Sequence, residues 1–358
     1  MNPFITTKTK NKKNNNNHIW IWVMVIIIFL FLFSSYIFSQ EYEVFLFQED
    51  PEWQYIDYLS YKDTPIKIAI IDKGELENDQ DYDLFAEYAS GNGSSSWHGS
   101  RVISMLKSGP VNTQSAGIFT GICNQCEVLY ADVNTKREDE LADATTWAID
   151  NGAQLLNFSI SGNRGEEFLN VLNPALDDPN LFVITAGANI NQTPRWGHED
   201  VSRDVWSIGG LNRFQDAIME GYATTETNSN IKFSAPAENV HNYAGVSDGT
   251  SYASPLFLGA VARILAYTNN GYSRSELYAL LASYGDPIEN GGYKIRWGDL
   301  IQTEFNISRT RKTVLVKDLN GNEVTLIIDL IYEDSTHIKS YLYRFEFDDV
   351  AYKIHKEL

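Results

Sequence analysis

The sequence predicts an α/β protein whose doubly wound, mainly parallel sheet carries helices on both faces. Apolar segments of strand length, such as 65–72 and 181–189, alternate with segments of helical periodicity, such as 138–151. This alternation is typical of parallel sheets, because a helix usually connects each strand to the next parallel one. Near the C-terminal end the pattern changes to alternating strands around an Asn-Gly turn, which predicts a small antiparallel β appendage over 301–358.

The individual elements follow from apolar patterns between turn residues. Continuous apolar runs predict buried strands at 65–72, 126–133, 153–162, 181–189, 205–210 and 231–236. Helical spacing predicts helices from His98 and over 138–151, 168–176, 256–265 and 273–283, the second stopped by Gly152. Gly and Ala within 256–265 predict a buried helix whose backbone approaches a sheet closely. Alternation predicts the appendage strands 313–317, 324–332 and 337–347.

Length and charge restrict the classes of function. A chain of 358 residues is long enough for one large domain, expected over 66–300, and a small appendage. Four of the 28 Lys and Arg residues lie within 1–39, and no acid precedes Glu41, so the rest of the chain has 24 basic against 47 acidic residues. The strong negative charge of residues 40–358 repels polyanions, and we therefore expect no nucleic-acid partner.

Residues 1–39 have the composition of an export segment. A basic, Asn-rich head precedes the apolar run 19–33, and Ile37 and Ser39 are acceptable at the −3 and −1 positions of a signal-peptidase site. Extended to Phe38, the run has 20 residues, enough for one membrane span with its basic end in the cytoplasm. A cleaved signal peptide is favoured over a retained N-terminal membrane anchor, and both predict an exported protein.

Two features next to the main domain carry structural predictions. Residues 40–65 are rich in aromatic side chains, which predicts an N-terminal arm packed against the domain. The only cysteines, Cys123 and Cys126, form a C-x-x-C pair that could serve redox chemistry, a metal or a local disulfide. No histidine lies within ten residues on either side, and an exported protein favours the disulfide.

Three polar residues stand where a parallel sheet places functional groups. Asp72 ends a buried strand, and sites in such sheets form at the carboxyl ends of strands. His98 begins a helical segment after a Gly- and Ser-rich loop, and Ser251 lies in Asp-Gly-Thr-Ser-Tyr-Ala-Ser-Pro (248–255) before an apolar helix. Each taken alone has a plainer interpretation, namely an acid capping a turn, a surface histidine and a helix N-cap.

Together these motifs resemble the subtilisin-like serine proteases (subtilases, peptidase S8). Segment 248–255 is similar to the family's nucleophile segment, and the order Asp72, His98, Ser251 is similar to the family's order. Asn189 follows Ala-Gly-Ala, which resembles the family's Ala-Ala-Gly-Asn. The resemblance covers roughly residues 66–300 and implies the subtilisin-like fold.

The resemblance implies a serine endopeptidase acting on protein or peptide substrates. His98 would take the proton of Ser251, Asp72 would orient and stabilise the imidazolium, and Asn189 would donate to the oxyanion. The backbone N–H of Ser251 would be a second oxyanion donor. No cofactor is expected to be required. Calcium is possible as a structural ion, as in many relatives, although no ligand spacing fixes a metal site.

Departures from the family pattern leave an alternative open. Lys73 stands where Thr or Ser usually follows the aspartate, and we expect it to point away from Asp72 because neighbours on an extended chain alternate. Ser100 and Ala237 replace a threonine and a glycine of the pattern. The alternative is an inactive subtilase-like protein that acts as a binding or surface module. An α/β-hydrolase esterase would need Gly-x-Ser-x-Gly and the order Ser, Asp, His, and the chain has neither.

The resemblance also implies a pocket for the substrate residue that precedes the scissile bond. In the family this pocket is lined by Ser-Leu-Gly and Ala-Ala-Gly. Two of the wall glycines are replaced here by side chains, whereas a third position gains a glycine, which predicts a narrowed pocket and a preference for small residues. The matching positions are Ser159, Ile160, Ser161, Ala186, Gly187 and Ala188.

Overall fold

The computed structural model describes most of the main domain and the C-terminal strands. The described residues are 50, 52–59, 65–74, 76, 84–89, 97–107, 121–134, 137–160, 165–187, 189, 204–219, 231–242, 245–289, 291–317, 323–333, 337–347 and 350–357. The predictions for 1–39 lie outside these residues, as do Ser161 and Ala188. No helix within the described ranges is long and apolar enough to cross a bilayer.

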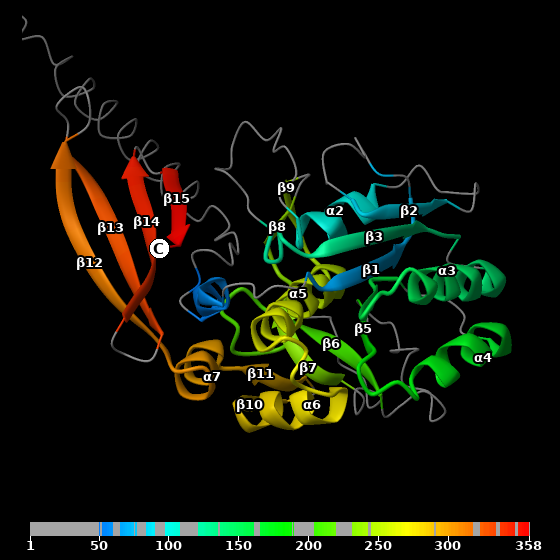
Figure 1. The fold of residues 1–358 in the computed structure, drawn as a ribbon. Helices are drawn as coiled ribbons and strands as arrows, with labels where there is room; N and C mark the ends of the chain where they lie inside the picture. Colours follow the sequence, from blue (N-terminus) through cyan, green and yellow to red (C-terminus); the bar gives the residue numbers. More distant parts are fainter. Residues whose placement is uncertain are drawn as a thin grey trace, which may run out of the picture. The chain divides into compact units, whose positions relative to one another are not determined.

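A nine-stranded sheet forms the centre of the main domain, in the order β10-β11-β7-β6-β5-β4-β1-β3-β2 (Figure 1). Neighbouring strands are parallel throughout except for the edge pair β10–β11. The predicted mainly parallel sheet is therefore confirmed. Its strands are β1 (Lys67–Asp72), β2 (Ala86–Ala89), β3 (Glu127–Asp132), β4 (Leu155–Phe158), β5 (Phe182–Ala186), β6 (Val205–Leu211), β7 (Ile231–Pro236), β10 (Gly285–Ile288) and β11 (Gly292–Ile295).

Helices cover both faces of the sheet, as predicted (Figure 1). One hydrophobic core joins α2 (His98–Ser104) and α5 (Thr250–Thr268) to the sheet, and a second joins α3 (Glu138–Asp150) and α4 (Glu166–Ala175) to it. Successive side chains of β1 alternate between these cores, with Ile68 and Ile70 in the first and Ala69 and Ile71 in the second. By the same period, Asp72 lies on the face of α2 and α5.

Helix α5 is buried along nearly its whole length. As predicted, its backbone lies close to the sheet, at strands β5, β6 and β7. A Cβ on Gly259 would lie 2.1 Å from Cγ2 of Ile122 and 2.9 Å from Cδ2 of Leu106, so this glycine lets the helix approach the segment before β3, not the sheet. The helix ends at Asn269, whose left-handed conformation (φ 53°) stops it.

Helices α6 (Arg274–Ser283) and α7 (Trp297–Glu304) follow α5 in the chain. Ser273 and Glu276 form a reciprocal capping box that starts α6 at the predicted position. Several elements of the domain were not predicted, namely strands β2, β10 and β11, helix α7, and a hairpin of β8 (Val240–Asn242) and β9 (Gly245–Ser247).

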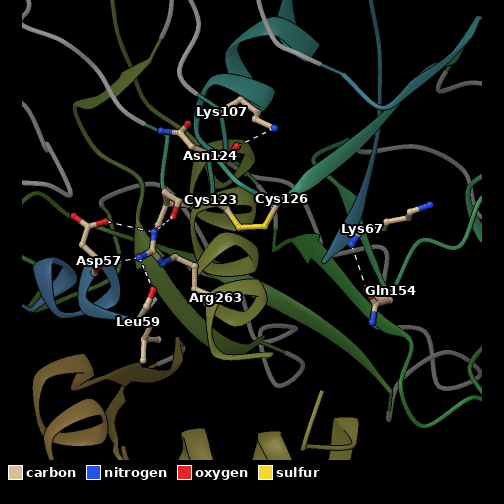
Figure 2. The surroundings of a disulfide bond; sticks show 10 residues. Asp57, Leu59, Lys67, Lys107, Cys123, Asn124, Cys126, Gln154 and Arg263 are labelled. Carbon is tan, nitrogen blue, oxygen red and sulfur yellow. Dashed lines mark hydrogen bonds and ion pairs between the residues drawn. A yellow bond between two sulfur atoms is a disulfide. The ribbon is translucent and has the colours of Figure 1, made fainter. Parts of the chain in front are cut away.

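The described part of the N-terminal arm contains the 3₁₀ helix η1 (Trp53–Tyr58), which packs against α7. The rings of Trp53 and Trp297 lie 5.3 Å apart, and Glu52 accepts a 2.8 Å hydrogen bond from the N–H of Gly298 at the start of α7. Arg263 of α5 donates to the backbone oxygens of Asp57 and Leu59 at 2.9 and 2.7 Å (Figure 2). The arm is thus bound to two helices of the domain.

A disulfide joins Cys123 and Cys126, which confirms the predicted local bridge. Both cysteines are buried, and the N–H of Cys123 donates to the oxygen of Leu106 at 2.9 Å. Lys107 donates to the oxygen of Asn124 at 2.9 Å (Figure 2). The bridged loop therefore fastens the segment after α2 to the start of β3.

The C-terminal segment forms a separate antiparallel sheet of four strands in the order β12-β13-β14-β15. The strands are β12 (Ile307–Lys317), β13 (Glu323–Glu333), β14 (His337–Phe347) and β15 (Val350–Glu357), so the appendage has one strand more than predicted. Arg309 of β12 donates to Gln54 and Tyr58 of η1, both at 3.0 Å. The first residues of this sheet thus contact the N-terminal arm.

Candidate active site

Asp72 and His98 form a direct hydrogen bond, with 2.7 Å between His98 Nδ1 and Asp72 Oδ1. Asp72 is fully buried at the end of β1, whereas the His98 side chain, at the start of α2, is 20% exposed. The backbone N–H of Lys73 also donates to Asp72 Oδ1, at 2.7 Å, and its side chain is exposed. Lys73 therefore points away from Asp72, as predicted, and does not compete with His98 for the carboxylate.

Ser251 is the second residue of α5. The helix follows Gly249, whose φ of 145° is a conformation that side chains rarely adopt. The Ser251 hydroxyl donates to the backbone oxygen of Ser159 at 3.0 Å, so it does not act as the N-cap. The serine is 7% exposed and lies at the positive end of the helix dipole.

Asn189 contacts the residue before Ser251. Its Oδ1 accepts hydrogen bonds from the backbone N–H of Thr250 at 3.1 Å and from the Thr250 hydroxyl at 2.9 Å. With its oxygen held in this way, the side chain can use its amide nitrogen as a donor. The amide is therefore fixed beside the first turn of α5.

The structure brings all four predicted residues to the same edge of the sheet. Asp72 ends β1, Asn189 lies three residues beyond β5, and Ser251 bonds to the residue that follows β4. The ring of His98 lies 6.3 Å from the ring of Tyr252, the neighbour of Ser251. Carboxyl ends of parallel strands form the binding edge of open α/β sheets, which is where these residues meet.

A buried chain of polar side chains, which the sequence did not indicate, supports Ser251 from β4. Asn157 donates to the Ser159 hydroxyl at 2.8 Å, and Ser159 donates in turn to the backbone oxygen of Ser251 at 2.9 Å. Ser254, one turn further along α5, donates to Asn157 Oδ1. These three side chains are at most 2% exposed, so their hydrogen bonds are shielded from water.

Two polar side chains of β3, Tyr130 and Asp132, were also missed. Both contact Gly74 in the turn after Asp72. Burial, and next the negative charges of Asp72 and Asp132, raise the pKa of Tyr130 well above its ordinary value. The signal in the sequence was an acid, Asp132, at the end of an apolar strand. That Asp132 binds Gly74 depends on the pairing of β1 with β3, which the sequence does not reveal.

The predicted pocket residues are described in part. Ser159 and Ile160 are buried, at 2% and 4% exposure. A Cβ on Gly187 would lie 2.6 Å from the backbone oxygen of Ile208, which closes this position. The expectation that Gly187 returns space to the pocket is therefore wrong, because its missing side chain makes room for β6.

The resemblance left calcium as a possible structural ion. Within the described ranges, no group of three or more His, Cys, Asp or Glu side chains is placed to hold a metal ion.

A model of the Subtilase family (peptidase S8) matches residues 12–290. The chain belongs to the subtilase family. No similarity to a curated protein sequence was found.

Several solved structures share the fold of this subtilase. The prenylagaramide maturation protease PagA has 19% identity and a TM-score of 0.55, covering 71% of this chain and 98% of its own. The PatG macrocyclase domain has 14% identity and a TM-score of 0.58, covering 74% and 98%. The nisin leader peptidase NisP from Lactococcus lactis has 17% identity and a TM-score of 0.51, covering 69% and 90%. At these identities the likeness concerns the fold.

Proposed function

We propose that this subtilase is an exported serine endopeptidase with the triad Asp72, His98 and Ser251. The observation that carries the proposal is the 2.7 Å bond between buried Asp72 and His98, formed beside the helix start that holds Ser251. A carboxylate bound to one imidazole nitrogen fixes the tautomer and leaves the other nitrogen to act as base. The family and fold of the chain support the same reaction class.

In the proposed reaction, the Ser251 oxygen attacks the carbonyl carbon of the scissile peptide bond and passes its proton to His98. The imidazolium, stabilised by Asp72, then protonates the leaving amine, and water hydrolyses the acyl-enzyme with His98 again as base. Asn189 and the backbone N–H of Ser251 donate to the oxyanion. Before attack, the Ser251 hydroxyl must exchange its bond to Ser159 for one to His98.

Export rests on the N-terminal segment. Its basic head and apolar run favour a cleaved signal peptide, with a retained anchor as the other route to the outside. The disulfide between Cys123 and Cys126 supports an oxidising compartment. We further propose a preference for small residues before the scissile bond, because Ser161 and Ala188 replace the family's wall glycines.

Covalent labelling tests the proposed chemistry directly. A fluorophosphonate should label the purified protein once, at Ser251, because only an activated serine attacks such a phosphorus centre. Ser251→Ala should abolish labelling, and His98→Ala should reduce it to background. Absence of labelling in folded wild type would favour the alternative of an inactive binding module.

A further inference from the structure

Two side chains of β3 hold the turn that follows Asp72. The Tyr130 hydroxyl donates to the backbone oxygen of Gly74, and Asp132 accepts from the N–H of Gly74 at 2.7 Å. Residues two apart on a strand share a face, and both side chains are buried, at 0% and 3% exposure. Both backbone polar groups of this one glycine are therefore bound by β3.

The same tyrosine lies against the first turn of α2. A Cβ on Gly99 would lie 2.0 Å from Tyr130 Oη and 2.6 Å from Cζ, so the phenol occupies the space that a side chain would need. The N–H of Gly99 also donates to the backbone oxygen of Lys73, at 3.3 Å. Tyr130 is thus in contact with both the turn after β1 and the start of α2.

These contacts join the two segments that carry the Asp72–His98 pair. Asp72 lies two residues before Gly74, and His98 immediately precedes Gly99. The 2.7 Å bond between the two side chains requires that the turn and the helix keep a fixed separation. Tyr130 spans that separation, with its hydroxyl on the turn and its ring against the helix.

We infer that Tyr130 is a positioning residue, which keeps His98 in hydrogen-bond contact with Asp72 by fixing the β1 turn against α2. The inference rests on the proposed function, since it assigns Tyr130 to the proposed catalytic pair. Burial raises the pKa of Tyr130, so the phenol remains a hydrogen-bond donor to higher pH than an ordinary tyrosine does. Asp132 holds the same turn through its other backbone group.

The variant Tyr130→Phe tests this role, because it keeps the ring and removes only the hydroxyl. With the backbone oxygen of Gly74 released, we expect kcat to fall about tenfold and KM to stay within about twofold. A small misplacement of a catalytic group lowers turnover without removing substrate contacts. The low-field proton resonance of the His98–Asp72 hydrogen bond, assigned by its loss in His98→Ala, should broaden or shift.

Tyr58→Phe is the matched control. Tyr58, in the arm, is also buried, at 3% exposure, and its hydroxyl accepts a 3.0 Å hydrogen bond from Arg309 of β12. This variant should lose stability but keep kcat and the low-field resonance.

A second measurement uses Gly99→Ala, whose methyl group meets the phenol of Tyr130. The loss of kcat caused by this alanine should be much smaller in a Tyr130→Leu background, because the clashing ring atoms are gone.

The outcomes separate this inference from the proposed function. If Tyr130→Phe loses only stability, with kcat and the resonance as in Tyr58→Phe, Tyr130 has a merely structural role and the inference is wrong. If wild type is not labelled by a fluorophosphonate, the proposed function fails. The response of the His98 resonance to Tyr130→Phe then still decides whether the tyrosine positions the pair.

Discussion

Ser251 and Ser159 are joined by two hydrogen bonds, each hydroxyl donating to the backbone oxygen of the other residue, at 3.0 and 2.9 Å. The pair connects the end of β4 to the first turn of α5. It holds the proposed nucleophile in place through its backbone, and it gives the Ser251 hydroxyl an acceptor other than the proposed base His98. The strength of this connection depends on Asn157, which donates to the Ser159 hydroxyl.

Asn157→Ala should therefore weaken both the fold and the nucleophile. It leaves the buried hydroxyls of Ser159 and Ser254 without their amide partner, and an unsatisfied buried polar group costs about 1–3 kcal/mol. Denaturant unfolding should show this loss, and the rate of fluorophosphonate labelling should fall about tenfold, because the first turn of α5 is less well held.

The control for Asn157→Ala is Ser207→Ala. It breaks another buried hydroxyl pair, Thr185 with Ser207 at 3.1 Å, which involves no residue of α5. This variant should lose stability and keep the labelling rate. Equal labelling rates in both variants would mean that the hydrogen bonds of Asn157 to Ser159 and Ser254 do not position Ser251.

Asn189→Ala should lower kcat by roughly 10²–10³ and leave KM little changed, a magnitude that the removal of an oxyanion donor has in subtilisin itself. The physical reason is that the oxyanion exists only in the transition state, so its donor contributes little to substrate binding. Thr250→Val should lower kcat by less than Asn189→Ala does, because it removes only one of the two donors that hold Asn189 Oδ1. A rise in KM at constant kcat in Asn189→Ala would instead assign Asn189 to ground-state binding.

Tyr130 should make the fold sensitive to alkali. Its pKa is raised in the folded protein, so above about pH 10 the unfolded chain releases a proton that the folded protein retains. The stability that depends on this group is complete below pH 10 and falls as pH rises toward the folded pKa, by at most about 1.4 kcal/mol per pH unit. Unfolding free energies at pH 9, 10 and 11 should fall less steeply in Tyr130→Phe than in wild type. Equal slopes would contradict the assignment.

The arm should be retained in the mature protein, because it is part of the packed structure. Arg263→Ala removes donors to Asp57, Leu59 and Ile122, and hydrogen bonds to charged groups contribute about 1.5–3 kcal/mol each. Thermal unfolding should detect a clear loss of stability. Arg213→Ala, at an exposed position where the guanidinium lies over the ring of Phe214, should change the stability by at most about 0.5 kcal/mol.

N-terminal sequencing checks the same prediction on the natural product. If residues 1–39 are a cleaved signal peptide, we expect a start at Gln40, and an intact start if they are a retained anchor. A mature start near Ile66 would contradict retention of the arm, since Trp53 and Glu52 would then be lost from α7.

The alternation of buried strands and helices could be predicted because local apolar patterns determine it. The candidate residues Asp72, His98, Asn189 and Ser251 were predicted from the resemblance to the subtilases, not from local patterns alone. Contacts that depend on register could not. Tyr130 reaches Gly74, 56 positions away, only because Asp72 pairs with Asp132 across β1 and β3.

Strand ends and weak strands were also beyond local patterns. Strand β4 ends at Phe158, four residues earlier than predicted, because Ser159 turns its polar groups to α5. Strand β2 has only four residues and no fully buried one, so no apolar run marks it. The interpretation of Gly187 failed because a missing side chain can make room either for a ligand or for a neighbouring strand, here β6.

Two side chains in the predicted pocket should restrict the substrate residue before the scissile bond. Ser161 and Ala188 place a hydroxymethyl and a methyl group where the family has glycines, and Gly187 offers no compensating space because the backbone of Ile208 fills it. Overpacking a close-packed wall costs about 1–3 kcal/mol, which corresponds to roughly 5- to 150-fold in kcat/KM against a large side chain. Peptides that differ only at this position should therefore rank Ala, Ser and Gly above Phe, Tyr and Leu.

The double variant Ser161→Gly/Ala188→Gly separates a narrowed pocket from other causes of the same ranking. If these two side chains form the obstruction, the variant should gain mainly on Phe and Leu peptides and change little on Ala peptides. The Asp72–His98 bond involves neither residue, so the chemistry on a small substrate serves as the internal control. A wild type that already prefers Phe, or a double variant that gains nothing on it, would mean that the strands part elsewhere to admit the large side chain.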